Sequence, residues 1–397
     1  MANVSSSNGL EKYPKLRFKG FSEPWKTETL GNLGAFMKGA PLSKADITDE
    51  GTPFILYGEL YTTYGEVTRS IKRRTDKIVE PQFYSRVGDV IMPTSGETPE
   101  DIATASCIML PNVILAGDLL IYRTQKVDGR LVSFVVKNKV NKQISSVAQG
   151  KSVVHVRAEE LSKVAITYPS AAEQQKILTM LELLEDKIIK QRELIERLKK
   201  YKRGVSIAVF DRKLSLAKNS PSWIKTTVGE ICKITMGQSP DSESYNTDQI
   251  GIPLVQGNAD MKNRITYPQR YTNKPTKVCD EGSIILSVRA PVGSVGRADR
   301  KVCLGRGVCA INADNNDFLY YFFERYEPYW KRIEQGGTFT AISGDDIADM
   351  PIDYPSFDER RLIANFLKKI DNHITAEENA LNQLVTMKNG ILQQMFI

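Results

Sequence analysis

Two stretches of the chain, residues 166–210 and 352–396, share a pattern in which apolar side chains recur at alternating spacings of four and three. In the first stretch these positions are Ile177, Leu181, Leu184, Ile188, Ile195 and Leu198. In the second stretch they are Ile363, Leu367, Ile370, Ile374, Leu381 and Leu384. Such spacings place one apolar stripe along an α-helix and correspond to the a and d positions of a heptad seam. The pattern therefore predicts two long helices that pack through their stripes.

The amino-terminal end of each predicted helix carries a capping signal. Ser170 and Glu173 have the spacing of a capping box, in which each side chain satisfies a free backbone donor of the first helical turn. Ser356 and Glu359 repeat this spacing in the second stretch. We therefore expect both helices to begin at the same place in the pattern.

The two stretches are copies of one another. They align without a gap at a shift of 186 positions, and 12 of the 45 aligned positions are identical, whereas chance would give about three at ordinary residue frequencies. One layer of the seam is polar in both copies, Gln191 and Glu377, as expected of a layer that fixes register. We interpret the chain as a tandem duplication whose helices form an antiparallel coiled coil. The alternative is that each helix packs only on its own globular domain.

The segments that precede the two helices predict globular domains of mixed α/β structure. Short apolar runs that open with Gly-Asp or Gly-Ser, at 88–95, 117–124 and 282–288, are typical of strands. The fold class expected is α+β, with two mixed α/β domains and two long helices related by a pseudo-two-fold internal repeat. The expected boundaries are 1–165 and 219–351 for the globular domains, and 166–218 and 352–397 for the helices.

Composition narrows the class of protein further. A chain of 397 residues with five cysteines, two histidines and no CxxC pair indicates neither a structural zinc site nor a disulfide framework. The polar amino terminus and the lack of a long apolar run indicate no secretion signal and no membrane span, so we expect a cytoplasmic protein. The net charge of +7 points weakly to a polyanionic partner.

Candidate catalytic chemistry is sparse. The best candidate is a loose nuclease-like match formed by Asp241, Asp260 and Lys262. Metal-dependent hydrolysis needs carboxylates that converge from rigid strands, whereas Asp260 lies in a polar, turn-like segment. We therefore expect no catalytic residue and no metal ligand in this chain, and a metal-dependent nuclease remains the alternative from another class. A coiled-coil scaffold without a DNA role is a third possibility.

Mixed aromatic, amide and basic residues in the domain loops suit DNA recognition, since such side chains anchor phosphates and read base edges. In the first domain the candidates are Tyr61, Tyr64, Lys72, Arg73 and Arg74. In the second domain they are Gln256, Asn258, Lys262, Arg264 and Arg289. The alternative is that the charges form solvated surface, that the tyrosines belong to the core, and that Arg289 folds back onto its own domain.

The repeated helix start carries a resemblance to a known family. Tyr168-Pro169 followed by Glu173-Gln174 and Ile177, then Tyr354-Pro355 followed by Glu359-Arg360 and Ile363, resembles the specificity subunit of type I restriction-modification systems over nearly the whole chain. The segment GSIILSVRAPVG at 282–293 is similar to a stretch common in these subunits. Arg360 departs from the pattern, where glutamine is usual.

The resemblance implies a non-catalytic subunit of a multi-subunit enzyme. Each globular domain is then a target recognition domain that reads one half of a bipartite, asymmetric sequence in double-stranded DNA, and the helices set the gap between the half-sites. The implied partners are two methyltransferase subunits and two restriction or translocase subunits. S-adenosylmethionine, ATP and magnesium belong to those partners, and no cofactor is expected in this chain. A related system with a fused methyltransferase-nuclease partner is the alternative.

Overall fold

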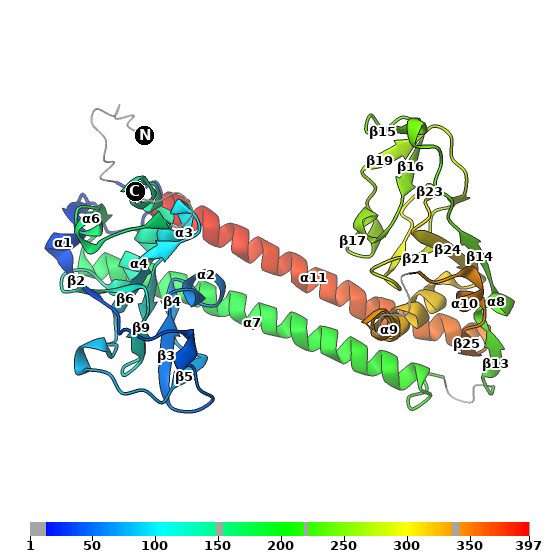
Figure 1. The fold of residues 1–397 in the computed structure, drawn as a ribbon, viewed down its shortest axis with the longest axis horizontal. Helices are drawn as coiled ribbons and strands as arrows, with labels where there is room; N and C mark the ends of the chain where they lie inside the picture. The colour runs from blue at the N-terminus through cyan, green and yellow to red at the C-terminus, as the bar shows by residue number, and fades with distance from the viewer. Residues whose placement is uncertain (1–12, 148–153, 218–220, 336–340, 397) are drawn as a thin grey trace. The chain divides into compact units, whose positions relative to one another are not determined.

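The computed structural model describes residues 13–147, 154–217, 221–335 and 341–396 (Figure 1). The chain divides into two compact units. Unit 1 contains Met1–Lys190 and Leu381–Ile397, and unit 2 contains Gln191–Ala380. Two long helices, α7 (Ala171–Phe210) and α11 (Phe357–Met395), each contribute one part to unit 1 and the other part to unit 2.

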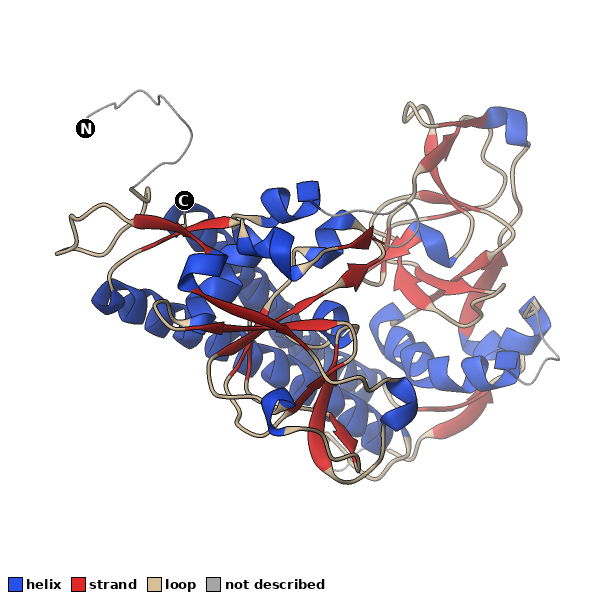
Figure 2. Cartoon of the chain, turned by 60° about the vertical axis from the view of Figure 1, so that its left-hand side comes forward, coloured by secondary structure: helices blue, strands red, loops and turns tan. Residues whose placement is uncertain are grey.

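Unit 1 is built on a five-stranded mixed sheet of order β2-β10-β6-β8-β4. Its strands are among those drawn in red in Figure 2. Its strands are β2 (Gly34–Lys38), β10 (Leu119–Thr124), β6 (Asp89–Pro93), β8 (Ser106–Ile108) and β4 (Val67–Thr68). A three-stranded sheet contains β5 (Arg73–Thr75), β3 (Thr52–Leu56) and β9 (Ile114–Ala116). Two-stranded pairs are formed by β1 (Lys26–Thr29) with β12 (Ala165–Tyr168), and by β7 (Ser95–Gly96) with β11 (Val154–His155). Every residue of β6 is buried, as expected for a central strand covered on both faces.

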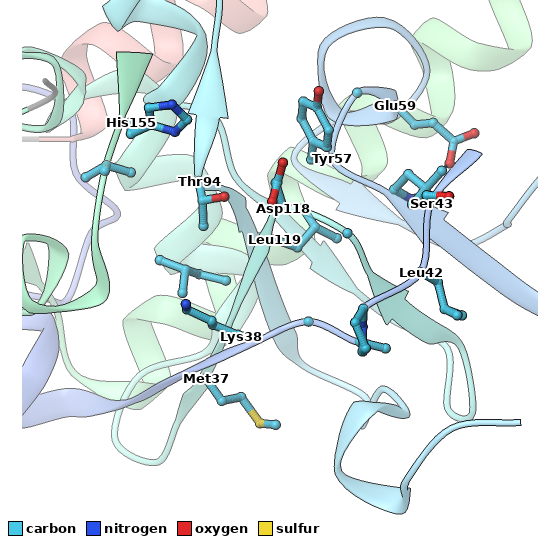
Figure 3. Close-up of a pocket in the computed structure, with 18 of the residues that line it drawn as sticks. Met37, Lys38, Leu42, Ser43, Tyr57, Glu59, Thr94, Asp118, Leu119 and His155 are labelled. Carbon is cyan, nitrogen blue, oxygen red and sulfur yellow. Dashed lines mark hydrogen bonds between the residues drawn. The ribbon is translucent and has the colours of Figure 1, made fainter. Parts of the chain in front are cut away.

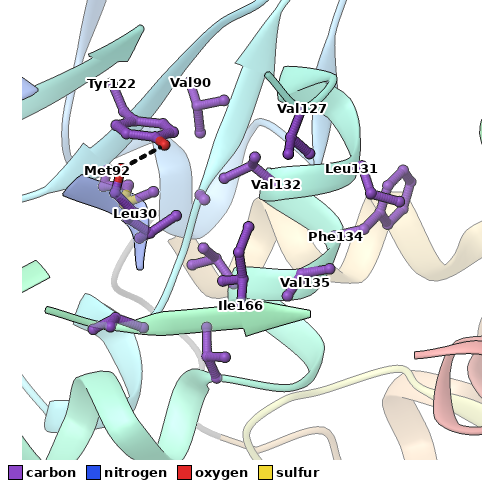
Figure 4. Close-up of a cluster of buried hydrophobic side chains, with 14 of the residues drawn as sticks. Leu30, Val90, Met92, Tyr122, Val127, Leu131, Val132, Phe134, Val135 and Ile166 are labelled. Atoms are coloured by element: carbon purple, nitrogen blue, oxygen red, sulfur yellow. Dashed lines mark hydrogen bonds between the residues drawn. The ribbon is translucent and has the colours of Figure 1, made fainter. Parts of the chain in front are cut away.

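Short helices complete unit 1. They are α1 (Leu30–Leu33), α2 (Glu59–Thr62), α3 (Pro99–Ile102), α4 (Gly129–Asn138), α5 (Asn141–Val147) and α6 (Ala158–Ser162). The side chain of Asp128 caps α4 by accepting a hydrogen bond from the Arg130 main-chain nitrogen. Figure 4 shows the apolar side chains of α4 close to Val90 and Ile166, in one buried cluster. Tyr122 lies in this cluster and donates its hydroxyl to the Leu30 carbonyl oxygen at 2.9 Å, which satisfies the one polar atom of the buried ring.

Unit 2 repeats this plan with sheets of six and five strands in place of five and three. Its first sheet has the order β14-β24-β21-β22-β18-β17. These strands are β14 (Cys232–Met236), β24 (Val308–Ala313), β21 (Ile284–Ser287), β22 (Val295–Arg297), β18 (Ile265–Thr266) and β17 (Met261–Lys262). Its second sheet contains β15 (Tyr245–Asn246), β19 (Arg270–Thr272), β16 (Ile252–Val255), β23 (Val302–Leu304) and β20 (Val278–Cys279). The helices are α8 (Val228–Ile231), α9 (Asn316–Gln335) and α10 (Gly344–Ala348), and β13 (Ile224–Thr227) pairs with β25 (Pro351–Tyr354).

The strand pairings establish which elements of the two units correspond. In each unit an antiparallel pair, β1 with β12 or β13 with β25, joins the start of the globular part to the strand that leads into a long helix. In each unit the strand β4 or β18 runs parallel to its neighbour, β8 or β22. The α+β fold class and the internal repeat expected from the sequence are therefore confirmed.

Two further properties concern the chain as a whole. All five cysteines are free thiols, and four of them are buried. Among the described residues, no helix combines the length and apolar character needed to cross a membrane.

Candidate nucleic-acid interface and helical spacer

Within unit 2, the second half of α7 and the first half of α11 run antiparallel. Gln191 donates its Nε2 to the main-chain carbonyl oxygen of Glu377 at 3.0 Å and to the carboxylate of the same residue. Further along α7, Lys202 Nζ lies 2.7 Å from a carboxylate oxygen of Asp371. Residue numbers rise along α7 while those of the partners fall along α11, so the predicted antiparallel helix pair is present in this unit.

Within unit 1, the first half of α7 meets the final turns of α11. Ile177 and Leu181 share one buried cluster with Leu392 and Met395. Lys388 of α11 forms an ion pair with Glu185 of α7. The alternative in which each helix packs only on its own globular domain is therefore wrong, because the helices contact each other in both units.

None of the twelve predicted seam residues is exposed. The buried ones are Ile177, Leu181, Ile188, Ile195, Ile363, Leu367, Ile370 and Ile374. The half-buried ones are Leu184, Leu198, Leu381 and Leu384. Complete burial of one such side chain stabilises the folded state by about 1.5–3 kcal/mol. Leu183, one position away from the stripe, is 65% exposed.

The predicted capping boxes form only in part. Ser356 Oγ accepts a hydrogen bond from the Glu359 main-chain nitrogen at 3.4 Å. The prediction for Glu173 needs correction, because both of its carboxylate oxygens accept from the Arg17 guanidinium, at 2.8 and 2.9 Å, and the side chain is only 1% exposed. A carboxylate that is buried to this degree is stabilised more by a charged partner than by a main-chain amide of the helix. In the first box, the main-chain carbonyl oxygen of Ser170 accepts a hydrogen bond from the Gln174 main-chain nitrogen at 2.9 Å.

The two glutamates of the boxes connect their helices to equivalent segments. Arg17 lies ahead of β1, and Trp223 lies directly ahead of β13. Trp223 donates its Nε1 to the Glu359 carboxylate at 3.0 Å. In both units the glutamate therefore ties the start of the long helix to the chain that enters the globular part.

The two tyrosines predicted as DNA contacts in unit 1 have structural partners. The Tyr61 hydroxyl donates to the Ser95 carbonyl oxygen at 2.6 Å. The Tyr64 hydroxyl accepts from the Lys72 main-chain nitrogen at 3.0 Å. Burial raises the pKa of both phenols, so both remain protonated at neutral pH. The hydrogen bonds of Tyr61 and Tyr64 therefore help to hold the 58–77 segment in its conformation.

The three basic residues of the same segment are exposed. Arg73 donates its Nε to a carboxylate oxygen of Glu59 at 3.2 Å, and Arg74 donates to the Gly51 carbonyl oxygen at 2.9 Å. Both guanidiniums keep further donors, since each carries five N–H groups. Lys72 presents an exposed ammonium beside them.

A groove of about 1510 Å³ lies beside this segment and was not foreseen from the sequence. Figure 3 shows Tyr57, Ser43 and Glu59 on one side of it and Thr94 and His155 on the other. Its lining includes four Lys or Arg side chains and four Asp or Glu side chains: Lys38, Lys44, Arg73, Arg157, Glu59, Asp118, Glu159 and Glu160. This balance of charge does not favour a phosphate channel, and the lining residues come from segments too distant in sequence to form a recognisable motif.

Two of the candidates in unit 2, Lys262 and Arg264, lie at the turn between β17 and β18. Lys262 is exposed and its Nζ lies 5.3 Å from the centre of the Tyr267 ring. Tyr267, which the sequence analysis missed, is 54% exposed. Gln256 donates its Nε2 to the Tyr245 hydroxyl at 3.1 Å, and Asn258 begins the short 3₁₀ helix Asn258–Asp260.

Two arginines of unit 2 differ in their surroundings. Arg289 follows β21 and has an exposed side chain, while its backbone bridges to Ala341. Arg264, predicted to contact DNA, forms an ion pair with Glu327 at 2.6 Å and with Glu324 at 3.4 Å. These carboxylates raise the pKa of Arg264 against the opposing effect of burial. The Arg264 side chain is still 40% exposed, so its role in base reading stays a prediction.

The residues of the nuclease alternative have local roles. Asp241 accepts a hydrogen bond from the Glu243 main-chain nitrogen at 3.4 Å and caps a 3₁₀ turn. Asp260 accepts from the Gln256 main-chain nitrogen at 2.7 Å. Within the described ranges, no group of three or more His, Cys, Asp or Glu residues could hold a metal ion. The geometry therefore gives no support to a nuclease site at these residues.

Comparison with known proteins agrees with this architecture. The chain matches the type I restriction modification DNA specificity domain twice, at residues 22–200 and 222–386. It is 31% identical over 305 residues to the putative type I restriction enzyme MjaX specificity subunit of Methanocaldococcus jannaschii, with 71% of each chain covered. The MjaVIII specificity subunit of the same organism is 20% identical over 414 residues, with 96% of this chain and 94% of the relative covered.

Solved structures show the same fold. The S subunit of a type I restriction-modification system from M. genitalium superposes with a TM-score of 0.63 at 17% identity, over 97% of this chain and 99% of that one. A chain from a structure that describes assembly and conformational transition of the type I R-M system gives a TM-score of 0.62 at 24% identity, over 94% of this chain and 97% of that one.

A duplicated α/β unit whose two copies share a pair of long antiparallel helices is the architecture of a DNA specificity protein. The chain belongs to the family of type I restriction-modification specificity subunits.

Proposed function

We propose that this chain is the sequence-reading subunit of a type I restriction-modification complex, and that each globular part reads one half of a bipartite, asymmetric DNA target. The observation that carries this proposal is the contact between Gln191 and Glu377, which are equivalent residues of the two repeats and meet each other. A chain that contains two copies of one unit has two equivalent globular domains, and each of them can read one half-site. The proposed domain boundaries are 1–165 and 219–351 for the readers.

The long helices are proposed to set the gap between the half-sites. A helix of 40 residues is about 60 Å long at 1.5 Å per residue. Burial of eight of the seam residues within the two units supports this role for the helices. The proposed spacers are residues 166–218 and 352–397.

Exposed side chains in each unit are proposed to contact the DNA. Lys72, Arg73 and Arg74 in unit 1, and Lys262 and Arg289 in unit 2, present cations to solvent. Such groups anchor phosphates or bind guanine edges. Tyr267 is proposed as an addition to the set, since it is exposed and adjoins Lys262.

The helices are also proposed to dock the partner subunits. Tyr201 on α7 and Met387 on α11 occupy equivalent positions of the two repeats, and they are 55% and 56% exposed. A large apolar side chain exposed at the same position of both copies fits two copies of one partner. We propose the methyltransferase subunits as these partners, and two restriction or translocase subunits as further members of the complex.

We propose that the catalytic groups lie in those partners and that the assembly works in the cytoplasm. S-adenosylmethionine, ATP and magnesium would be bound by the methyltransferase and translocase subunits, and this chain would supply recognition alone. A second candidate is the same role in a system whose methyltransferase and nuclease are fused in one partner chain. Isolation of the natural partner distinguishes the two.

One experiment tests the spacer directly. Insertion of one helical turn into both α7 and α11, at equivalent positions, should lengthen the gap between the half-sites and leave the bases of both half-sites unchanged. The readout is the set of adenines modified by the assembled complex. A change in the half-sites at constant gap would contradict the proposal.

A further inference from the structure

Two lysines at equivalent positions of the repeats form equivalent ion pairs. Lys202 of α7 lies 2.7 Å from Asp371 of α11. Lys388, which is 186 positions later, pairs with Glu185 of α7. Asp371 and Glu185 are themselves equivalent at the same shift. The side chains of the two lysines are only 12% and 15% exposed, so each helix presents a largely covered cation to an acid of the other helix.

Each lysine also contacts an acid of the globular part of its own unit. In unit 2, Lys202 lies 2.7 Å from Glu324 of α9. In unit 1, Lys388 lies 3.4 Å from Glu66, and Glu66 also pairs with Lys137 of α4 at 3.2 Å. Burial lowers the pKa of Lys388, but Glu66 and Glu185 outweigh this effect and raise it. Lys388 therefore remains charged, and each lysine joins the two long helices to the globular part of its unit.

Both sets of ion pairs lead from the long helices to equivalent positions of the two globular parts. Glu66 directly precedes β4, and Arg264 directly precedes β18, the corresponding strand of unit 2. The carbonyl oxygen of Glu66 accepts from the Cys107 nitrogen, and that of Arg264 accepts from the Arg297 nitrogen, both at 2.9 Å. Lys388 binds Glu66 directly, whereas Lys202 reaches Arg264 through Glu324.

The backbone of unit 2 is strained where its network ends. Asn263 and Arg264 have φ angles of +52° and +61°. Asparagine tolerates this left-handed region, whereas a long side chain such as arginine adopts it only when its surroundings compensate. The compensation comes from Glu327, whose carboxylate binds the Arg264 guanidinium at 2.6 and 2.9 Å and also accepts from the Val295 nitrogen at 2.9 Å. The ion pairs therefore hold the β17–β18 turn in one conformation.

The segments held in this way are the ones that carry the proposed DNA contacts. The β17–β18 turn separates Lys262 from Ile265 and lies close to Tyr267 in the chain. Glu66 lies between Tyr64 and Lys72, in the 58–77 segment. Buried ion pairs add little net stability compared with apolar packing, but their geometry is directional and specific. A role in placement therefore explains them better than a role in stability.

We propose that Lys202 and Lys388 are positioning residues that fasten the DNA-reading segment of each unit to the long helices and so define the gap at which the half-sites are read. This inference rests on the proposed function. The DNA-reading segments attach through Arg264 in unit 2 and Glu66 in unit 1, and the two lysines have the same role in the two units.

The test uses the full complex, assembled from this chain and its methyltransferase subunits. Duplexes carry the two half-sites mapped for the wild-type complex, at the wild-type gap and at gaps one or two base pairs shorter or longer, and initial rates of adenine methylation are measured for each. Lys202→Met should lower the preference for the wild-type gap by roughly tenfold, the factor equivalent to about 1.4 kcal/mol. Discrimination against base changes in the half-site read by unit 1 should stay unchanged, and Lys202→Arg should restore most of the gap preference.

A matched control and a second variant complete the design. Arg300→Met removes an exposed ion pair with Asp299 in the same unit and should leave the gap preference intact. Arg264→Asn removes the attachment cation while asparagine tolerates the positive φ angle, so this variant should fold and should lose gap preference as Lys202→Met does. If Lys202→Met fails to assemble, Arg264→Asn decides the outcome.

Wild-type gap preference in an assembled Arg264→Asn complex would overturn the inference, and so would wild-type preference in an assembled Lys202→Met complex. These results leave the proposed function standing, because the wild-type complex would still modify a split site with a fixed gap. Absence of a split site in the wild-type complex would refute the proposed function and the inference with it.

Discussion

Gln191 and Glu377 are equivalent residues of the two repeats, and the Gln191 side-chain amide donates hydrogen bonds to both the carbonyl oxygen and the carboxylate of Glu377. A residue can meet its own counterpart only close to the axis that relates two copies. This polar layer therefore lies where equivalent positions of the two helices face each other within unit 2. It also interrupts an apolar seam, and a single polar layer of this kind specifies register at some cost in stability.

The polar layer of Gln191 and Glu377 gives a prediction about stability. Gln191→Leu should destabilise the chain by about 1–3 kcal/mol, because the half-buried Glu377 carboxylate loses its amide donor. The double variant with Leu at both positions should recover this loss, since two leucines extend the seam. Guanidinium denaturation of the purified subunit measures both effects. Equal stability of the single variant and the wild-type chain would contradict the assignment.

A second prediction separates the seam from the exposed face of α7. Ile177 is fully buried, and Ile177→Ala should cost about 2–5 kcal/mol through lost burial and a cavity. Leu183 is 65% exposed, and Leu183→Ala should change stability by no more than about 0.5 kcal/mol. Ile363→Ala should behave as Ile177→Ala does, because the two residues are equivalent and Ile363 is 1% exposed. Indistinguishable denaturation midpoints for Ile177→Ala and Leu183→Ala would rule out this seam.

The ion pairs of Glu66 predict a pH dependence. Burial alone would raise the pKa of Glu66, but Lys137 and Lys388 outweigh it and lower the pKa below its ordinary 4.5. The stabilising contribution is therefore fully present above pH 4.5 and is lost as the pH falls through the lower, folded-state pKa. Glu66→Gln should melt at a lower temperature than the wild-type chain at neutral pH. The two melting temperatures should converge as the pH falls below 4.5. A constant difference over this range would show that Glu66 is not ionised in the folded chain.

The proposed phosphate contacts predict a salt dependence. If Lys72 or Lys262 neutralises a DNA phosphate, its change to Met should lower the slope of log affinity against log salt by about 0.9. Affinity should fall equally for cognate and unrelated sequences, because a phosphate contact carries no base information. Titrations of the assembled complex at several salt concentrations measure the slope, and Arg300→Met serves as the control. An unchanged slope would remove that lysine from the interface.

The exposed pair on the long helices predicts a docking defect. Tyr201→Glu and Met387→Glu should each weaken binding of one methyltransferase subunit, because a charge replaces an exposed apolar side chain at a proposed contact. The double variant should lose both subunits. Ile224→Glu alters a side chain outside the long helices that is 68% exposed, and this variant should assemble normally. Analytical ultracentrifugation reports the stoichiometry, and a full complex from the double variant would exclude this docking surface.

The helices were predictable from sequence because their stabilisation is local and periodic. A seam such as Ile177 to Leu198 requires apolar side chains at fixed spacings, and the repeat displays the same requirement twice. The duplication then indicated that the helices would meet, and the hydrogen bond between Gln191 and Glu377 agrees with that expectation.

The side-chain roles in the globular parts were not predictable in the same way. Arg264 looks like a free recognition residue in the sequence, but its partners Glu324 and Glu327 lie about 60 positions away in the chain. Glu173 has capping spacing, yet its carboxylate binds Arg17, which is 156 positions away. Ion pairs of this range depend on the tertiary fold and leave no periodic signal in the sequence.

The most direct measurement is a methylation map of the DNA in a host that has no adenine methylation of its own, after co-expression of this chain with its methyltransferase subunit. We expect one split motif, with two short half-sites separated by a gap of fixed length and unspecified bases. An assembled complex that modifies no split motif would contradict the central claim that this chain reads two half-sites.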